Sequence, residues 1–218
     1  MFDLIVFDLD GTLIDSVGDI ADALNAALAS VGRAPLSDEQ VSRLVGAGAG
    51  ELVRRALGDG AQKIDGAQAD FEIVRERFLA AYAERPARRT GLYLGVRETL
   101  AALDAPKAIA TNKPGALARK IVEELGVAGD FFAVLGEDDV GRRKPDPLVV
   151  DLLRGRVGAA RARTLYVGDS RTDAQTAEAA RVPLCLVTYG YEDPRVIREL
   201  PARWHVDRFS DLKRITRE

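Results

Sequence analysis

The sequence LIVFDLDGTL at residues 4–13 places a run of four apolar residues directly before two aspartates that are one residue apart. A short run that is apolar at every position is typical of a parallel strand buried on both faces. Side chains two residues apart on a strand project to the same side, so Asp8 and Asp10 are expected to lie together where the strand ends. Gly11 then permits a sharp turn whose backbone N–H groups can meet an anion.

Further apolar runs extend this pattern along the chain. They lie at residues 108–110, 131–135, 164–167 and 184–187. Between the later runs, apolar residues recur at helical spacing, over residues 116–125, 148–156 and 173–180. Strands that alternate with helices in this way predict an α/β fold with a doubly wound parallel sheet.

The interval between the first two strands breaks the alternation. It holds about a hundred residues, whereas a single crossover helix needs about a dozen. Much of it is periodic in the manner of helices, from Ile20 to Val31 and again from Phe71 to Tyr82. We therefore expect a helical insertion at residues 16–86, with residues 1–15 and 87–218 forming the sheet domain.

The composition narrows the possible functions. With 31 Lys and Arg against 34 Asp and Glu, the net charge of −3 does not suggest a nucleic-acid or anionic-membrane partner. The single Cys185 excludes an internal disulfide, and the single His205 leaves little for Ser-His catalysis or for histidine metal sites. No apolar run approaches the roughly 20 residues that span a bilayer, and no signal-peptide pattern begins the sequence, so we expect a cytoplasmic protein.

Polar residues follow the later strands as they follow the first. Thr111 and Asn112 come directly after the second strand, Lys144 stands before a proline, and Asp169 and Asp173 come after the fourth strand. Singly, each has an ordinary interpretation as a helix cap, a solvated lysine or an acid at a helix start. In this order, at the edge where open α/β sheets bind ligands, they predict an active site.

Phosphoryl transfer is the chemistry that these residues suit. The carboxylates of Asp8 and Asp169, with the backbone carbonyl of Asp10, match a hard octahedral cation that keeps several waters. We expect Asp8 to be the nucleophile and Asp10 the general acid and then the general base. Lys144, Thr111 and backbone N–H groups would spread the charge of the transferring phosphoryl group.

With these motifs the sequence resembles the haloacid dehalogenase superfamily of phosphatases over essentially its whole length. The motifs are Asp8-Leu9-Asp10-Gly11-Thr12, Thr111, Lys144-Pro145, and Gly168-Asp169 with Asp173. The resemblance implies a Rossmann-like core, an α-helical cap inserted after the first strand, and Mg²⁺. It also implies that Asp173 contacts the metal ligands without binding the metal itself. Phosphate contacts are implied for Gly11, Thr111, Asn112 and Lys144.

Within the superfamily the sequence is most similar to phosphoglycolate phosphatases. The similarity lies in Thr111-Asn112-Lys113-Pro114, Val45-Gly46-Ala47-Gly48, the segment from Gly168 to Asp173, and Tyr189-Gly190-Tyr191. The sequence departs from that family at Arg181 and Leu94, where glycine and proline are usual. The resemblance implies hydrolysis of a small phosphorylated metabolite, with 2-phosphoglycolate the expected substrate, by a monomer or homodimer.

Other functions stay open on the sequence alone. The same aspartates would serve a phosphomutase of the β-phosphoglucomutase type, or a phosphatase for another small phosphate ester or pyrophosphate. A non-catalytic binding protein on this fold is a third hypothesis. In the insertion, Gly46 to Gly50 with Arg54 or Arg55 could meet a substrate carboxylate, or could equally form a hinge with solvated arginines.

Overall fold

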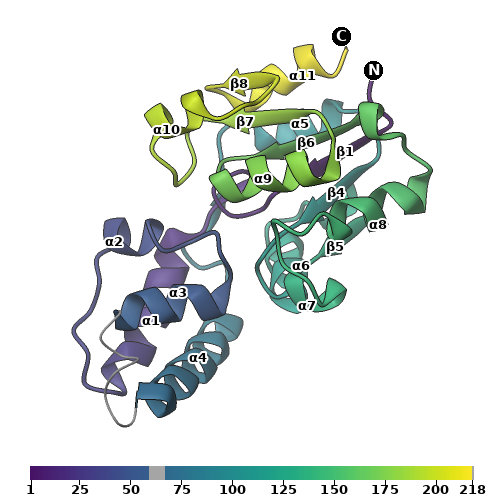
Figure 1. The fold of residues 1–218 in the computed structure, drawn as a ribbon. Coiled ribbons are helices and arrows are strands. Elements are labelled where there is room, and N and C mark those ends of the chain that lie inside the picture. The colour runs from purple at the N-terminus through teal and green to yellow at the C-terminus, as the bar shows by residue number, and fades with distance from the viewer. Residues whose placement is uncertain (59–66, 218) are drawn as a thin grey trace. The chain divides into compact units, whose positions relative to one another are not determined.

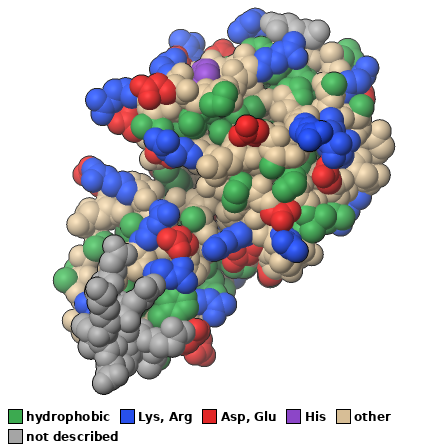
Figure 2. Space-filling model, viewed as in Figure 1, with side chains coloured by type: hydrophobic (Ala, Val, Ile, Leu, Met, Phe, Trp, Pro, Cys, Tyr) green, Lys and Arg blue, Asp and Glu red, His purple; other side chains and the backbone are tan. Residues whose placement is uncertain are grey.

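The computed structural model describes residues 1–58 and 67–217, and the chain forms two compact units (Figure 1). One unit comprises Met1–Asp15 with Gly91–Glu218, and the other comprises Ser16–Thr90. The helical unit thus ends four residues beyond the end at residue 86 expected from the sequence. No helix in the described ranges is long and apolar enough to cross a membrane. Acidic and basic side chains are interspersed over the face that Figure 2 shows.

Six parallel strands form the sheet of the first unit, in the order β5-β4-β1-β6-β7-β8. The strands are β1 (Leu4–Phe7), β4 (Lys107–Ala110), β5 (Ala133–Leu135), β6 (Thr164–Gly168), β7 (Leu184–Val187) and β8 (Trp204–Val206). Numbered along the sheet's own strands, this is the order 3-2-1-4-5-6 of a Rossmann-type doubly wound fold. The predicted fold class is confirmed. The edge strand β8 has only three residues, and the sequence analysis did not predict it because it contains no apolar run.

Helices connect the strands of this unit. They are α5 (Val96–Ala102), α6 (Gly115–Glu124), α7 (Glu137–Val140), α8 (Leu148–Val157), α9 (Arg171–Ala180), α10 (Pro194–Glu199) and α11 (Leu212–Ile215). Short 3₁₀ turns lie at Ala128–Asp130, Arg161–Arg163 and Phe209–Asp211. Helix α8 packs against β1 and β4, and α9 packs against β6 and β7 (Figure 1).

Strand β1 is buried on both faces of the sheet. Leu4 and Val6 join the apolar cluster that α8 and α9 complete. Phe7 contacts the rings of Phe131 and Phe209, with centroid separations of 6.3 and 5.7 Å. Because both faces are covered, every position of the strand is apolar, which is the pattern that residues 4–7 show in the sequence.

A two-stranded hairpin stands where the chain leaves the first unit and returns to it. Strand β2 (Ile14–Asp15) pairs antiparallel with β3 (Gly91–Leu92), and the N–H of Tyr93 donates to the carbonyl of Leu13 at 3.0 Å. We call this pair the linker hairpin. Strands of two residues carry no periodicity, so the sequence did not predict it.

The second unit is helical, as expected for the insertion. It contains α1 (Val17–Ala29), α2 (Asp38–Ser42), α3 (Ala49–Leu57) and α4 (Ala67–Glu84), with α1 packed along α4. Leu24 and Leu28 on α1, and Val74 and Phe78 on α4, are buried. Helix α3 was not expected, because its first turn lies within the glycine-rich segment from Gly46 to Gly50.

The start of α1 is fastened to the segment that leads out of this unit. The carboxylate of Asp19 is buried, and its Oδ2 accepts the N–H groups of Arg89 and Thr90 at 2.8 and 2.7 Å. The same oxygen accepts the hydroxyl of Thr90 at 2.7 Å. One carboxylate therefore satisfies three donors of the returning chain.

Candidate active site

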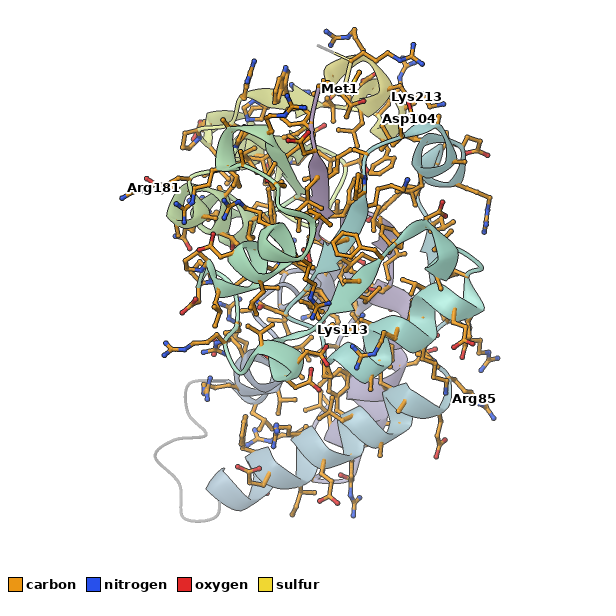
Figure 3. All side chains as sticks on the ribbon, turned by 90° about the vertical axis from the view of Figure 1, so that its right-hand side faces the viewer. Met1, Arg85, Asp104, Lys113, Arg181 and Lys213 are labelled. Carbon is orange, nitrogen blue, oxygen red and sulfur yellow. The ribbon has the colours of Figure 1, made fainter. Side chains whose placement is uncertain are left out.

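The candidate site lies at the carboxyl ends of the central strands. Strand β1 pairs with β4 on one side and with β6 on the other, so the strand order reverses there. Asp8 follows β1 and Asp169 follows β6, which brings both to this switch point. Figure 3 shows Lys113 at this end of the sheet and Met1 at the opposite end.

Three buried carboxylates are grouped at this edge. Asp8, Asp169 and Asp173 each offer an oxygen, and these oxygens lie within 4.8 Å of one another. Burial raises the pKa of Asp8 to about 7, with Lys144 opposing the shift and Asp173 adding to it. Burial also raises the pKa of Asp169 well above its usual range, and Asp173 and Asp8 reinforce that effect. Three carboxylates with Lys144 as their cation leave negative charge uncompensated, and carboxylate oxygens are the ligands that a divalent cation such as Mg²⁺ prefers.

Lys144 is the cation that the chain itself supplies to this group. Its Nζ lies 2.7 Å from Oδ1 of Asp8 and 2.8 Å from Oδ1 of Asp173, and its side chain is 2% exposed. Burial works against the charged ammonium, but Asp173 and Asp8 outweigh it and raise the pKa of Lys144 well above its usual value. The two carboxylates therefore favour the charged form of Lys144.

Asp173 differs from the other two carboxylates in its contacts. Its Oδ1 accepts the hydroxyl of Tyr166 at 3.1 Å in addition to Lys144. Its Oδ2 accepts the N–H groups of Asp169 and Ser170, and the hydroxyl of Ser170 at 2.6 Å. Five donors occupy its two oxygens, so Asp173 orients Lys144 and the loop that carries Asp169. This arrangement suits a support of the site better than a metal ligand.

Asp10 is paired with a lysine that the sequence analysis did not single out as functional. Nζ of Lys113 forms an ion pair with Oδ1 of Asp10, and the two side chains are 5% and 11% exposed. Lys113 stands two residues after Thr111, in the loop that follows β4. That position beside a predicted site residue is the signal that could have identified it.

Thr111 and Asn112 are both buried at this edge. The hydroxyl oxygen of Thr111 accepts the N–H of Lys113 at 3.1 Å, which leaves its own proton to donate. The side-chain amide of Asn112 accepts the N–H of Lys144 at 2.8 Å and donates to the carbonyl of Lys144 at 3.2 Å. Asn112 thus holds the backbone of Lys144 in place, and its expected phosphate contact stays a prediction.

The turn after β1 wraps closely around Asp169. The hydroxyl of Thr12 donates to Oδ1 of Asp169 at 2.9 Å. Gly11 has a φ of 84°, and a Cβ built on it would lie 2.3 Å from Oδ2 of Asp169. Both the backbone conformation and the lack of space therefore require glycine at this position.

The two arginines expected to meet a substrate, Arg54 and Arg55, have partners inside the helical unit. Arg54 and Arg55 on α3 both form ion pairs with Glu51, and both side chains are about half exposed. Arg54 also lies over the ring of Phe71, 5.5 Å from its centroid. These contacts account for both arginines without a substrate, so a role for them in recognition stays a prediction.

The first unit is a doubly wound parallel sheet with a buried lysine and several aspartates at its switch point, and comparison with known families shows which class of protein this is. The sequence model of the family described as haloacid dehalogenase-like hydrolase matches residues 5–187. The chain belongs to this family.

Similar proteins have phosphatase names. The chain is 42% identical over 192 residues to a phosphoglycolate phosphatase of Rhodospirillum rubrum, covering 86% of this chain and 80% of the relative. It is 40% identical over 219 residues to a phosphoglycolate phosphatase of Pseudomonas syringae pv. tomato, covering 97% and 78%. A crystal structure of a predicted phosphoglycolate phosphatase from Haemophilus somnus 129PT aligns with a TM-score of 0.90 at 33% identity, covering 99% and 98%. The chain is accordingly a phosphatase-type enzyme of the family.

Proposed function

We propose that this protein is a Mg²⁺-dependent phosphomonoesterase that hydrolyses a small phosphorylated metabolite, 2-phosphoglycolate above others, through a phosphorylated Asp8. The observation that carries the proposal is the buried contact of Lys144 with both Asp8 and Asp173, beside Asp169. The choice of substrate is supported by relatives at 40–42% identity that are named phosphoglycolate phosphatase.

Asp8 supplies the nucleophile in this proposal. Lys144 contacts Oδ1 of Asp8, and we assign Oδ2 to the attack on phosphorus. The new bond joins Oδ2 to phosphorus while the bond from phosphorus to the ester oxygen breaks. The charge that spreads over the phosphoryl oxygens would be met by Lys144 and the hydroxyl of Thr111. The N–H groups of Gly11 and Thr12 already donate to the carbonyls of Ile14 and Leu9, so the expected phosphate contact of Gly11 stays a prediction.

Asp10 acts as the general acid in the first step of the proposed reaction and as the general base in the second. It would give a proton to the departing alkoxide, and would later accept one from the water that attacks the phosphorus of phospho-Asp8. The second attack releases inorganic phosphate and restores the Asp8 carboxylate. The ion pair with Lys113 holds the Asp10 side chain at the site and would keep its carboxylate in one orientation between the two steps.

Asp8 and Asp169 would hold the metal through their side chains, and Asp10 through its backbone carbonyl. When bound, Mg²⁺ would offset the repulsion among the carboxylates and neutralise charge on the phosphate. The raised pKa values of Asp8 and Asp169 show how strongly burial disfavours their ionised forms without such a cation.

Substitution of Asp8 tests the nucleophile. Asp8→Asn keeps the shape of the side chain but removes its charge, so turnover of 2-phosphoglycolate should fall by at least about 10³-fold, with the circular dichroism spectrum unchanged. Asp22→Asn is the matched control, because Asp22 is 56% exposed in the helical unit and should retain full activity. Near-normal phosphate release by Asp8→Asn would refute the assignment.

A panel of phosphorylated metabolites, ranked by kcat/KM, tests the substrate. The proposal places 2-phosphoglycolate first, with stoichiometric release of inorganic phosphate. If another phosphate ester or pyrophosphate ranked first, the proposed substrate would be wrong, while the proposed hydrolysis through phospho-Asp8 would stand. Interconversion of labelled sugar phosphates without phosphate release would instead establish the phosphomutase alternative.

A further inference from the structure

The loop after β7 reaches the site from a part of the chain to which no catalytic role is assigned above. It has the sequence Tyr189-Gly190-Tyr191, and we call it the YGY strap. The backbone N–H of Tyr191 donates to Oδ2 of Asp169 at 2.9 Å. Since Thr12 donates to Oδ1 of the same residue at 2.9 Å, each oxygen of this carboxylate is held by a donor from a different loop. Two such anchors fix the plane of the carboxylate.

Gly190 lets the strap approach this close. A Cβ built on Gly190 would lie 2.2 Å from Oδ2 of Asp169 and 2.3 Å from its Cβ, far inside van der Waals contact. Any side chain at this position would displace the carboxylate or the strap. Asp169 is thus closely enclosed by two glycines, Gly11 and Gly190, that come from opposite ends of the sequence.

The two tyrosines tie the strap to the segments around the linker hairpin. The hydroxyl of Tyr189 donates to the carbonyl of Thr12 at 2.9 Å, and its ring lies 4.7 Å from that of Tyr93. The hydroxyl of Tyr191 donates to Oδ1 of Asp15, the last residue of β2, at 3.3 Å. Burial raises the pKa of Tyr189 far above its ordinary value, which favours the protonated hydroxyl that donates this bond.

We propose that the YGY strap is a positioning element for Asp169, and that it connects this metal ligand to the chain on which the helical unit is inserted. The inference rests on the proposed function, because it takes Asp169 as a ligand of Mg²⁺. The strap sets the orientation of the Asp169 carboxylate, and therefore the affinity of the site for the ion. Groups that orient metal ligands typically change affinity by about 10- to 100-fold when they are altered.

Isothermal titration calorimetry with Mg²⁺ alone measures this affinity without turnover. Gly190→Ala places a Cβ against Asp169, so the dissociation constant for Mg²⁺ should rise by at least about tenfold. Gly129→Ala is the matched control, because a Cβ at Gly129 meets no atom within 4 Å and the affinity should not change. Circular dichroism reports whether each variant is folded.

A second variant tests the strap if Gly190→Ala fails to fold. The double substitution Tyr189→Phe with Tyr191→Phe removes only two hydroxyls, and the dissociation constant should rise by about threefold or more. Unchanged affinity in a folded Gly190→Ala, or in the double variant where Gly190→Ala does not fold, would overturn the proposal. A wild-type protein that binds no Mg²⁺ would overturn the metal site and the strap together, whereas binding that survives these changes overturns the strap alone.

Discussion

At the level of single residues, the site brings several negative charges together in a buried place. Asp8, Asp169 and Asp173 are buried within reach of one another, and Lys144 is the cation that contacts two of them. Each carboxylate that loses water without gaining a positive partner costs several kcal/mol. Lys144 therefore holds the site together in the resting protein, before any substrate arrives.

Removal of Lys144 should be costly for stability as well as for activity. Lys144→Met leaves Asp8 and Asp173 buried without their cation, and the free energy of unfolding should fall by about 3 kcal/mol. Lys120→Met removes an exposed partner of Glu124 and should change stability by less than about 0.5 kcal/mol. Chemical denaturation of both variants measures the difference. Equal stability of the two would show that Lys144 does not balance the buried carboxylates.

Cys185 gives a prediction about pH. Burial raises the pKa of this thiol to about 12, and Asp211 adds to the shift. The raised value means that the folded state holds the proton more tightly than the unfolded chain, so this contribution to stability is present below about pH 9 and is lost as pH rises towards 12. At pH 8.5 the native protein should resist iodoacetamide, whereas protein in urea should react fully. Rapid alkylation of the native protein would show that the thiol is accessible.

At the level of elements, burial decided what the sequence could predict. Strand β1 and its neighbours are covered on both faces, so they appear as unbroken apolar runs. The linker hairpin has only two residues in each strand and leaves no periodic pattern. Helix α3 has apolar residues at helical spacing, but its start lies in a glycine-rich segment. The hairpin was missed because it depends on pairing between distant parts of the chain, and α3 was missed because glycine disfavours a helix.

Asp19 yields a prediction for the helical unit. Asp19→Ala would leave two backbone N–H groups and the hydroxyl of Thr90 without their acceptor, which should cost the unit about 3 kcal/mol. Hydrogen exchange of the amides in α1 should accelerate accordingly. Asp22→Ala removes a half-exposed partner of Arg89 and should leave that exchange nearly unchanged. Equal protection in the two variants would contradict the role of Asp19 as a fastening point.

At the level of the whole molecule, the sequence predicted which strand ends would meet at one edge, but not the contacts between the loops that follow them. Strand ends placed Asp8, Thr111 and Asp169 at one edge, because parallel strands end together. The contacts of Lys113 with Asp10, and of Asn112 with the backbone of Lys144, depend on loop conformations that no periodicity describes. The same is true of the YGY strap, which lies more than 170 residues from the turn at Thr12 that it contacts.

Metal should affect both activity and stability. Chelation should abolish turnover, and Mg²⁺ should restore it. Because the ion would bind the folded site alone, an excess of Mg²⁺ of 100 times its dissociation constant should add about 2.7 kcal/mol to the free energy of unfolding. Thermal unfolding across a Mg²⁺ series measures this increase. Full activity in chelator would contradict the metal requirement.

The most direct test of the account is to trap the phosphoryl group on the enzyme. Rapid acid quenching during turnover of ³²P-labelled 2-phosphoglycolate should leave ³²P bound to the protein. In a second sample, borohydride reduction releases that phosphate and should convert residue 8 to homoserine, as mass spectrometry of the peptide would show. Asp8 should carry the label, and the Asp8→Asn protein should carry none. Label on any other residue, or equal labelling of Asp8→Asn, would contradict the claim that Asp8 is the nucleophile.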